Sequence, residues 1–175
     1  MNSYKASPVS RDYLRRFADQ VRRRFLIDPT KAVDVLWLLE AVFPTVFAPL
    51  GFSYEIWDKD EMGDMHGLTS PINNTIYIRE DVYDKAARGV GRDRMTIMHE
   101  LAHYLLHDGV LVGLARRDNG ESIPTFCDPE WQATAFAAEL LMPANQIRHM
   151  TVQQIVETYG VSRQAAEYQL RTVNK

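Results

Sequence analysis

Apolar residues recur at helical spacing in the centre of the chain. Met98, Ala102 and Leu105 lie three or four positions apart, which places them on one face of a helix. A polar stretch at residues 92–94 suits the start of that helix, and Gly109 suits its end. We therefore predict one helix between these limits.

A second helical segment covers residues 130–141, which are rich in helix formers and are closed by Pro143. Its apolar stripe consists of Ala133, Phe136, Ala137, Leu140 and Leu141. At about 100° per residue, Glu130 falls at the edge of this stripe and Glu139 lies on the opposite side from Glu130. We therefore expect Glu130 to face the protein interior and Glu139 to face water.

The remaining patterns predict further helices and a small sheet. A helix is expected from near Ser10, and another over residues 28–42, where an aspartate cap precedes a proline suited to the first turn. β-branched and aromatic residues at 52–57 and 75–79 predict two strands just before the central helix. We expect a small antiparallel sheet, and an α+β fold that is mainly helical.

The end of the chain, residues 152–170, has the pattern of a helical hairpin that resembles a helix-turn-helix. Gly160 suits the turn, and Ser162 suits the cap of the second helix. In DNA-binding proteins the start of the second helix contacts base edges. Here Val156 occupies a close-packed position usually held by a small residue, and the segment carries few cations. Direct nucleic-acid binding is therefore disfavoured.

Six arginines gather on the predicted N-terminal helix, whose buried face is expected to carry Leu14, Phe17, Val21 and Phe25. We interpret the arginines as a solvated helix face. The alternative is a docking patch for an acidic partner or a phosphate backbone. The six are Arg11, Arg15, Arg16, Arg22, Arg23 and Arg24.

Composition narrows the class of protein. The 175 residues are 46% hydrophobic and carry a net charge of −3, which suits a single core and gives no general attraction to nucleic acid. No apolar run approaches the ~20 residues needed to cross a bilayer, and residues 1–5 lack the apolar stretch of a secretory signal. The single cysteine, Cys127, fits a reducing compartment and is interpreted as a small buried hydrophobe. We expect a cytoplasmic protein without membrane association, and the oligomeric state stays open.

The central predicted helix contains an H-E-x-x-H pattern, His99-Glu100-Leu101-Ala102-His103. Four residues make about 1.1 helical turns, so both imidazoles leave the same face and can bind one metal ion. Glu100 can lie beside an open coordination position without filling it. The pattern predicts a hydrolytic metal site with His99 and His103 as ligands and Glu100 as general base.

A catalytic zinc usually has three protein ligands. His107 continues the histidine series, but each four-residue step climbs about 6 Å along the axis and a zinc–nitrogen bond is about 2 Å, so His107 lies too far along the helix. Glu130 is the better candidate, because a carboxylate facing the interior needs a counter-charge. Weaker candidates between the two helices are Asp118, Glu121 and Asp128.

Two blocks of the sequence resemble the ImmA/IrrE-type metallopeptidases. Residues 98–107 match the histidine-rich HELGH…LH helix of that family, and residues 130–143 match its E..AN.FAAELLMP helix. The resemblance covers roughly residues 25–175. It implies zinc bound by His99, His103 and Glu130, with Glu100 as general base.

Two positions depart from the family pattern. Ala102 stands where the family commonly has glycine, which is a mild change on a packed face. Thr134 and Ala135 stand where an asparagine and a variable residue are usual. We expect the second change to remove one hydrogen bond near the site but no ligand.

The resemblance also implies a fold and a function. It suggests a zincin-like metallopeptidase domain over residues 1–145, with a hairpin at 146–175 packed on the same domain. The expected activity is that of a gluzincin-like zinc endopeptidase that cleaves a partner transcriptional repressor in a mobile-element or stress-response circuit. Candidate donors for stabilising the transition state are Tyr77, Tyr104 and His149, among which the sequence does not choose.

Two alternatives stay open. One is a zinc-containing interaction module that binds a regulator without cutting it, although binding alone would not need Glu100. The other is a DNA-binding helix-turn-helix protein with a structural metal, which the acidic net charge disfavours.

Overall fold

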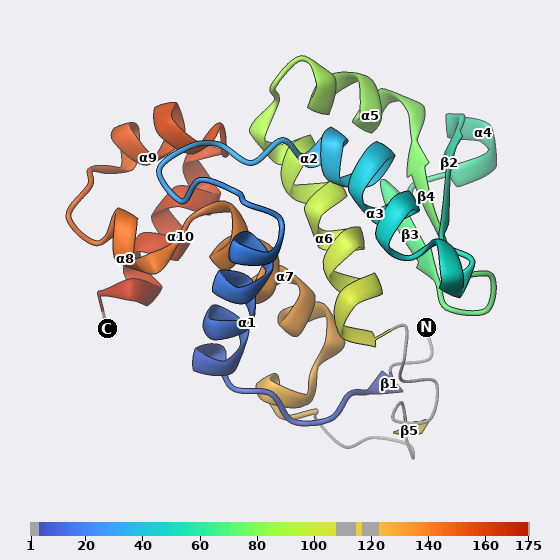
Figure 1. The fold of residues 1–175 in the computed structure, drawn as a ribbon, viewed down its shortest axis with the longest axis horizontal. Helices are drawn as coiled ribbons and strands as arrows, with labels where there is room; N and C mark the ends of the chain where they lie inside the picture. The colour runs from blue at the N-terminus through green and yellow to red at the C-terminus, as the bar shows by residue number, and fades with distance from the viewer. Residues whose placement is uncertain (1–3, 108–114, 117–122, 175) are drawn as a thin grey trace.

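The structure, a computed structural model, describes residues 4–107, 115–116 and 123–174. Helices form most of it, and a three-stranded sheet lies at one side of the molecule (Figure 1). The mainly helical α+β class is therefore confirmed. The helices are α1 (Arg11–Arg24), α2 (Val35–Trp37), α3 (Phe43–Val46), α4 (Lys59–Met62), α5 (Glu80–Ala87), α6 (Gly91–His107), α7 (Pro129–Leu141), α8 (Ala144–Ile147), α9 (Val152–Tyr159) and α10 (Arg163–Val173). The strands are β1 (Tyr4–Lys5), β2 (Ser53–Trp57), β3 (Gly67–Ser70), β4 (Thr75–Arg79) and β5 (Ala115–Arg116), of which β1 pairs with β5.

The three-stranded sheet has the order β2-β4-β3. β3 runs antiparallel to β4, as expected of neighbouring strands, but β2 runs parallel to β4. The expectation of a wholly antiparallel sheet is therefore wrong for one of these two pairings. The segment between the two predicted strands contains a helix, α4, and a third strand, β3. β3 and β4 form a hairpin, so β2 pairs with the other edge of β4. The connection between the parallel strands β2 and β4 runs through α4 and β3.

The core lies where α6 and α7 pack side by side, with α1 on the other flank of α7 (Figure 1). Ile97 and Leu101 of α6, and Phe136 and Leu140 of α7, are fully buried. Burial of side chains of this size is the main favourable contribution to folding. The two helices that carry the candidate site therefore pack against each other through fully buried side chains.

One facing prediction for α7 is reversed. Glu139, expected to face water, is 1% exposed and forms ion pairs with Arg11 and Arg15 of α1. A single apolar stripe identifies one packing face, whereas α7 contacts both α6 and α1. The side of α7 that carries Glu139 is therefore a second buried face. It contacts α1 through ion pairs at Glu139.

The arginines of α1 divide into two groups. Three are exposed, in agreement with a solvated face: Arg16, Arg23 and Arg24. The others make internal contacts, because Arg11 and Arg15 pair with Glu139 and the buried Arg22 donates to the backbone carbonyls of Asp28 and Leu140. The interpretation as a solvated face is thus wrong for half of the set.

The helix predicted over residues 28–42 begins later than expected. The Asp28 carboxylate accepts from the backbone N–H and hydroxyl of Thr30, at 2.8 and 2.7 Å, and this local turn competes with helix formation. Asp34 is the N-cap instead and accepts from Trp37 N at 2.9 Å. α2 then continues through a π-helical turn, Leu38–Val42, into α3.

The C-terminal hairpin forms as predicted. Gly160 ends α9 with φ 59°, and Ser162 caps α10 by accepting from Ala165 N at 3.2 Å. Tyr159 is 1% exposed and belongs to the same buried cluster as the side chains of α6 and α7. Arg94 of α6 donates to the carbonyls of Tyr159 and Gly160, which ties the hairpin to the central helix.

Among the described residues, none of the helices combines the length and apolar character needed to span a membrane.

Candidate functional site

His99, His103 and Glu130 come together at the junction of α6 and α7. The two histidines lie one turn apart on α6, and their Nε2 atoms are 2.9 Å apart. Glu130 approaches from the first turn of α7: its Oε2 lies 3.2 Å from His99 Nε2 and its Oε1 lies 3.3 Å from His103 Nε2. These three side chains are therefore a group that could hold a metal ion.

The spacing of the two imidazoles and the Glu130 carboxylate suits a zinc ion. Ligand atoms about 2.0–2.1 Å from a tetrahedral zinc would lie about 3.3 Å from one another. The two imidazole Nε2 atoms are 2.9 Å apart, and each lies 3.2 or 3.3 Å from a different oxygen of the Glu130 carboxylate. Two imidazole nitrogens and a carboxylate oxygen are also a ligand set typical of catalytic zinc. The residues present thus suit the metal that the sequence pattern predicts.

The start of α7 fixes the position of Glu130. Asp128 is the N-cap and accepts from Glu130 N at 3.0 Å, and Pro129 follows at the first helical position. The Glu130 side chain is 70% exposed, against 20% for His99 and 16% for His103. Glu130 thus does not face the interior as predicted; it lies at the solvent-exposed rim of the histidine pair. Close contact with the His103 and His99 rings holds the pKa of its carboxyl below the ordinary value.

Glu100 lies against strand β3 of the sheet. It is 7% exposed, and its Oε2 accepts from the Thr69 hydroxyl of β3 at 2.8 Å. Gly67, on the same strand, leaves the space that the carboxylate occupies, since a Cβ there would lie 2.6 Å from Glu100 Cγ and 2.9 Å from Oε1. Strand β3 therefore positions Glu100, although the sequence pattern did not predict this strand.

Replacing Gly67 with alanine should displace Glu100 without affecting the histidines. The new Cβ would collide with the Glu100 side chain, and a misplacement of about 1 Å at a catalytic group can lower the rate about 10²-fold. We expect metal content to stay unchanged while hydrolysis falls by about that factor. Steady-state hydrolysis and elemental analysis would test this, with Leu68→Ala on the exposed face of β3 as control. Full activity in Gly67→Ala would contradict the role given to β3.

His107 is not part of the ligand group, in agreement with the geometric argument from helix rise. Its Nδ1 lies 3.1 Å from His103 Nδ1, and its Nε2 lies 3.0 Å from Gln132 Oε1. Burial lowers the pKa of His107. Gln132 was missed in the sequence, although a glutamine in an alanine-rich buried helix is itself an indication of a specific polar partner.

The other candidates have separate places. Thr134 keeps a hydrogen bond to the site, because its Oγ1 lies 3.2 Å from His99 Nδ1, so the expected loss at this position is wrong. Cys127 is buried, as predicted. Asp118 and Glu121 lie outside the described residues.

The three candidate transition-state donors lie in different surroundings. Tyr104 is buried among Phe43, Phe47 and Phe52. Tyr77 is buried, and its ring centroid lies 4.3 Å from that of Trp57 with the two rings tilted by 52°. His149 is exposed just after α8.

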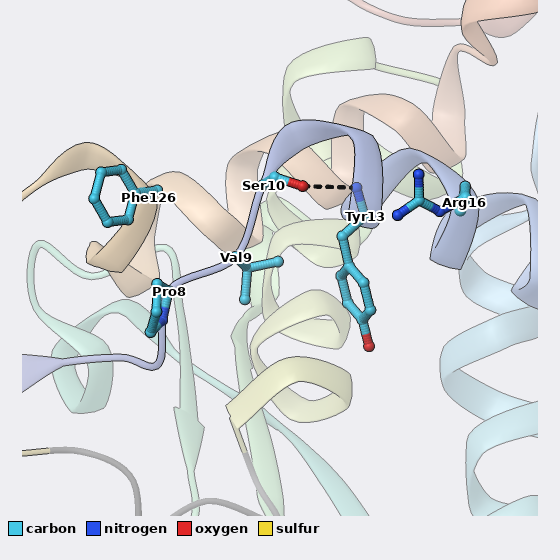
Figure 2. Close-up of a pocket in the computed structure, with 6 residues that line it drawn as sticks. All are labelled: Pro8, Val9, Ser10, Tyr13, Arg16 and Phe126. Carbon is cyan, nitrogen blue, oxygen red and sulfur yellow. Dashed lines mark hydrogen bonds between the residues drawn. The ribbon is translucent and has the colours of Figure 1, made fainter.

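An open hollow of about 750 Å³ lies where the N-terminal segment enters α1 (Figure 2). Tyr13 and Phe126 in its wall are about half exposed. None of its lining residues belongs to the histidine–glutamate group, so it is a feature separate from the candidate site. The lining consists of Pro8, Val9, Ser10, Tyr13, Arg16 and Phe126.

A central histidine-bearing helix, a flanking strand and an acidic residue from a second helix are the parts of a zincin-like metallopeptidase domain. The sequence model of the peptidase family described as the IrrE N-terminal-like domain matches residues 57–171, which is well over half of the chain. The chain therefore belongs to this metallopeptidase family, as the two sequence blocks indicated. A comparison with curated proteins gave no match.

Proposed function

We propose that the protein is a zinc-dependent endopeptidase that cleaves a partner transcriptional repressor. The observation that carries the proposal is the convergence of three donor atoms within 4.8 Å of one another, from His99, His103 and Glu130. Membership of a metallopeptidase family supports the reaction class. The choice of a transcriptional repressor as substrate follows from the resemblance to the ImmA/IrrE-type metallopeptidases.

The side chains divide the chemistry between them. His99, His103 and Glu130 would hold the zinc, which when bound acts as a Lewis acid that polarises the scissile carbonyl and acidifies water. Glu100 would accept the proton of the attacking water and deliver it to the departing amine. Thr69 limits the movement of the Glu100 carboxylate, since its hydroxyl donates to Oε2 at 2.8 Å.

The edge position of β3 supports a polypeptide substrate. Among the described strands, β3 pairs with β4 alone, and Gly67 in this strand lies against Glu100. An extended peptide could pair with the other side of β3 by strand addition. Such pairing would align its backbone beside the general base.

We place the proposed activity in the cytoplasm, without a membrane or nucleic-acid partner. The single buried cysteine suits a reducing compartment, and the net charge of −3 gives no general attraction to nucleic acid.

Metal content tests the proposed ligand set. Elemental analysis should find about one zinc per chain in the wild type, because catalytic zinc uses three protein ligands, and a clear loss in Glu130→Ala. Glu80→Ala is the control, since Glu80 is exposed on α5. Equal zinc in Glu130→Ala would show that Glu130 is not an essential ligand. Absence of zinc from reconstituted wild type would overturn the proposal.

Cleavage tests the proposed substrate. The zinc-loaded protein should be incubated with a repressor-type regulator encoded beside it, and the products analysed by mass spectrometry. We expect one specific cut, abolished by a chelator. A tight complex with uncut regulator would instead support the non-cleaving interaction module.

A further inference from the structure

A line of hydrogen-bonded side chains leads from His103 into the protein interior. His103 Nδ1 lies 3.1 Å from His107 Nδ1, and His107 Nε2 lies 3.0 Å from Gln132 Oε1. Gln132 Nε2 then donates to the backbone carbonyls of Ser7 and Phe126, both at 2.8 Å. His107 is 8% exposed and Gln132 is 1% exposed, so water competes little for these bonds.

The carbonyls of Ser7 and Phe126 determine which atom donates in the hydrogen bond between Gln132 and His107. A backbone carbonyl only accepts, so the group of Gln132 that faces both carbonyls must be its NH₂. The amide oxygen therefore faces His107 and also only accepts. It follows that His107 carries a hydrogen on Nε2.

The position of the hydrogen on His107 in turn determines which ring donates in its contact with His103. A neutral imidazole with hydrogen on Nε2 has a bare Nδ1, which accepts. The hydrogen between the two rings must therefore come from His103 Nδ1. This leaves His103 Nε2 without hydrogen, and Nε2 is the atom that faces His99 and Glu130.

His99 is held differently. Its Nδ1 contacts the hydroxyl of Thr134 at 3.2 Å, and a hydroxyl can donate or accept. If His103 Nε2 is bare, the 2.9 Å contact between the two Nε2 atoms requires hydrogen on His99 Nε2. His99 would then have to change tautomer to bind a metal, and the Thr134 hydroxyl can turn to allow this.

We propose that His107 and Gln132 are positioning residues that fix His103 as the Nδ1–H tautomer, with Nε2 free for the metal. The N-terminal segment, residues 6–9, anchors both residues. The inference rests on the proposed zinc site. Two backbone hydrogen bonds hold this segment beside residues 126–127. Ala6 N donates to Cys127 O and Val9 N donates to Phe126 O, both at 2.9 Å. Ser7 lies outside the residues 57–171 matched by the family model, so part of this support comes from beyond the matched domain.

Tautomers can be measured directly in the metal-free protein. Long-range ¹H–¹⁵N spectra of protein labelled at histidine, recorded at pH 8, distinguish Nδ1–H from Nε2–H. We expect Nδ1–H for His103 and Nε2–H for His107 and His99, with His99 alone changing on addition of zinc. In Gln132→Leu, His103 should become a mixture of tautomers. Wild-type His103 with hydrogen on Nε2 would overturn the inference.

Zinc affinity supplies a second test, by competition with a chelating dye. His107→Leu and Gln132→Leu should weaken binding about 10–100-fold, the usual effect of removing a partner behind a metal ligand. His107→Gln should restore most of the affinity, because its amide oxygen can accept from His103 Nδ1. Ile155→Val, buried in α9, is the control for general loss of packing.

The outcomes separate the two proposals. Wild type that binds no zinc would overturn the proposed function, and the tautomer spectrum would still decide the inference. Wild type that binds zinc, with His107→Leu and Gln132→Leu within twofold of it, would overturn the inference alone. If Gln132→Leu fails to fold by circular dichroism, the comparison of His107→Leu with His107→Gln decides.

Discussion

Glu100→Gln is expected to lower peptide hydrolysis by about 10²–10⁴-fold, the contribution typical of a positioned general base. Glutamine has nearly the shape of glutamate and can still accept from Thr69, whose hydroxyl lies 2.8 Å from Glu100 Oε2. It cannot take a proton from water at neutral pH. Glu100 is also absent from the group of three that could hold a metal, so zinc content should not change.

The measurement is a turnover assay with the cleaved regulator, alongside elemental analysis. Glu80→Gln is the matched control, because it makes the same substitution at an exposed position of α5. Loss of zinc together with activity would mean that Glu100 helps to hold the metal. Unchanged turnover would remove Glu100 from the mechanism and would favour a different base.

The parts of the site that could be predicted from the sequence are those set by helix geometry. His99, Glu100 and His103 lie within one turn of α6, so their relative positions follow from the rise and rotation of a helix. Glu130 could be selected because periodicity places it facing the interior and because the family resemblance implies it as a ligand. The structure does bring it to the histidines, but its side chain is 70% exposed, so the facing argument is wrong.

The parts that could not be predicted depend on contacts between distant segments. Thr69 and Gly67 reach Glu100 through β3, a four-residue strand with no alternating apolar pattern. The Gln132 amide is oriented by the Ser7 carbonyl, 125 positions away in the chain. Periodicity reports the face that one helix buries, and it says nothing of which distant polar groups will meet.

Glu139 is the most instructive of these failures, because the group that periodicity assigned to water holds two helices together. Its side chain is completely buried. Arg11 Nε lies 2.9 Å from Oε1, and Arg15 Nε lies 3.1 Å from Oε2. The arginine side chains remain partly exposed, at 15% and 27%. The Glu139 carboxylate is therefore the charged group that loses contact with water on folding. The free-energy cost of this desolvation must be offset by the two arginines.

Arg11→Met/Arg15→Met should destabilise the protein by about 3–5 kcal/mol, because it leaves a buried carboxylate without its partners. Adding Glu139→Met should recover most of this loss, since a buried ion group replaced by apolar residues of similar volume is often neutral or stabilising. Urea unfolding followed by circular dichroism would measure both, with Arg23→Met/Arg24→Met at exposed positions of α1 as control. Equal stability of the double variant and wild type would show that solvent reaches Glu139. Glu139 lies far along α7 from Glu130 and on a different side of the helix. The triple variant should therefore also keep wild-type zinc affinity. That result would show that the stability of α7 and the binding of zinc by Glu130 depend on different side chains.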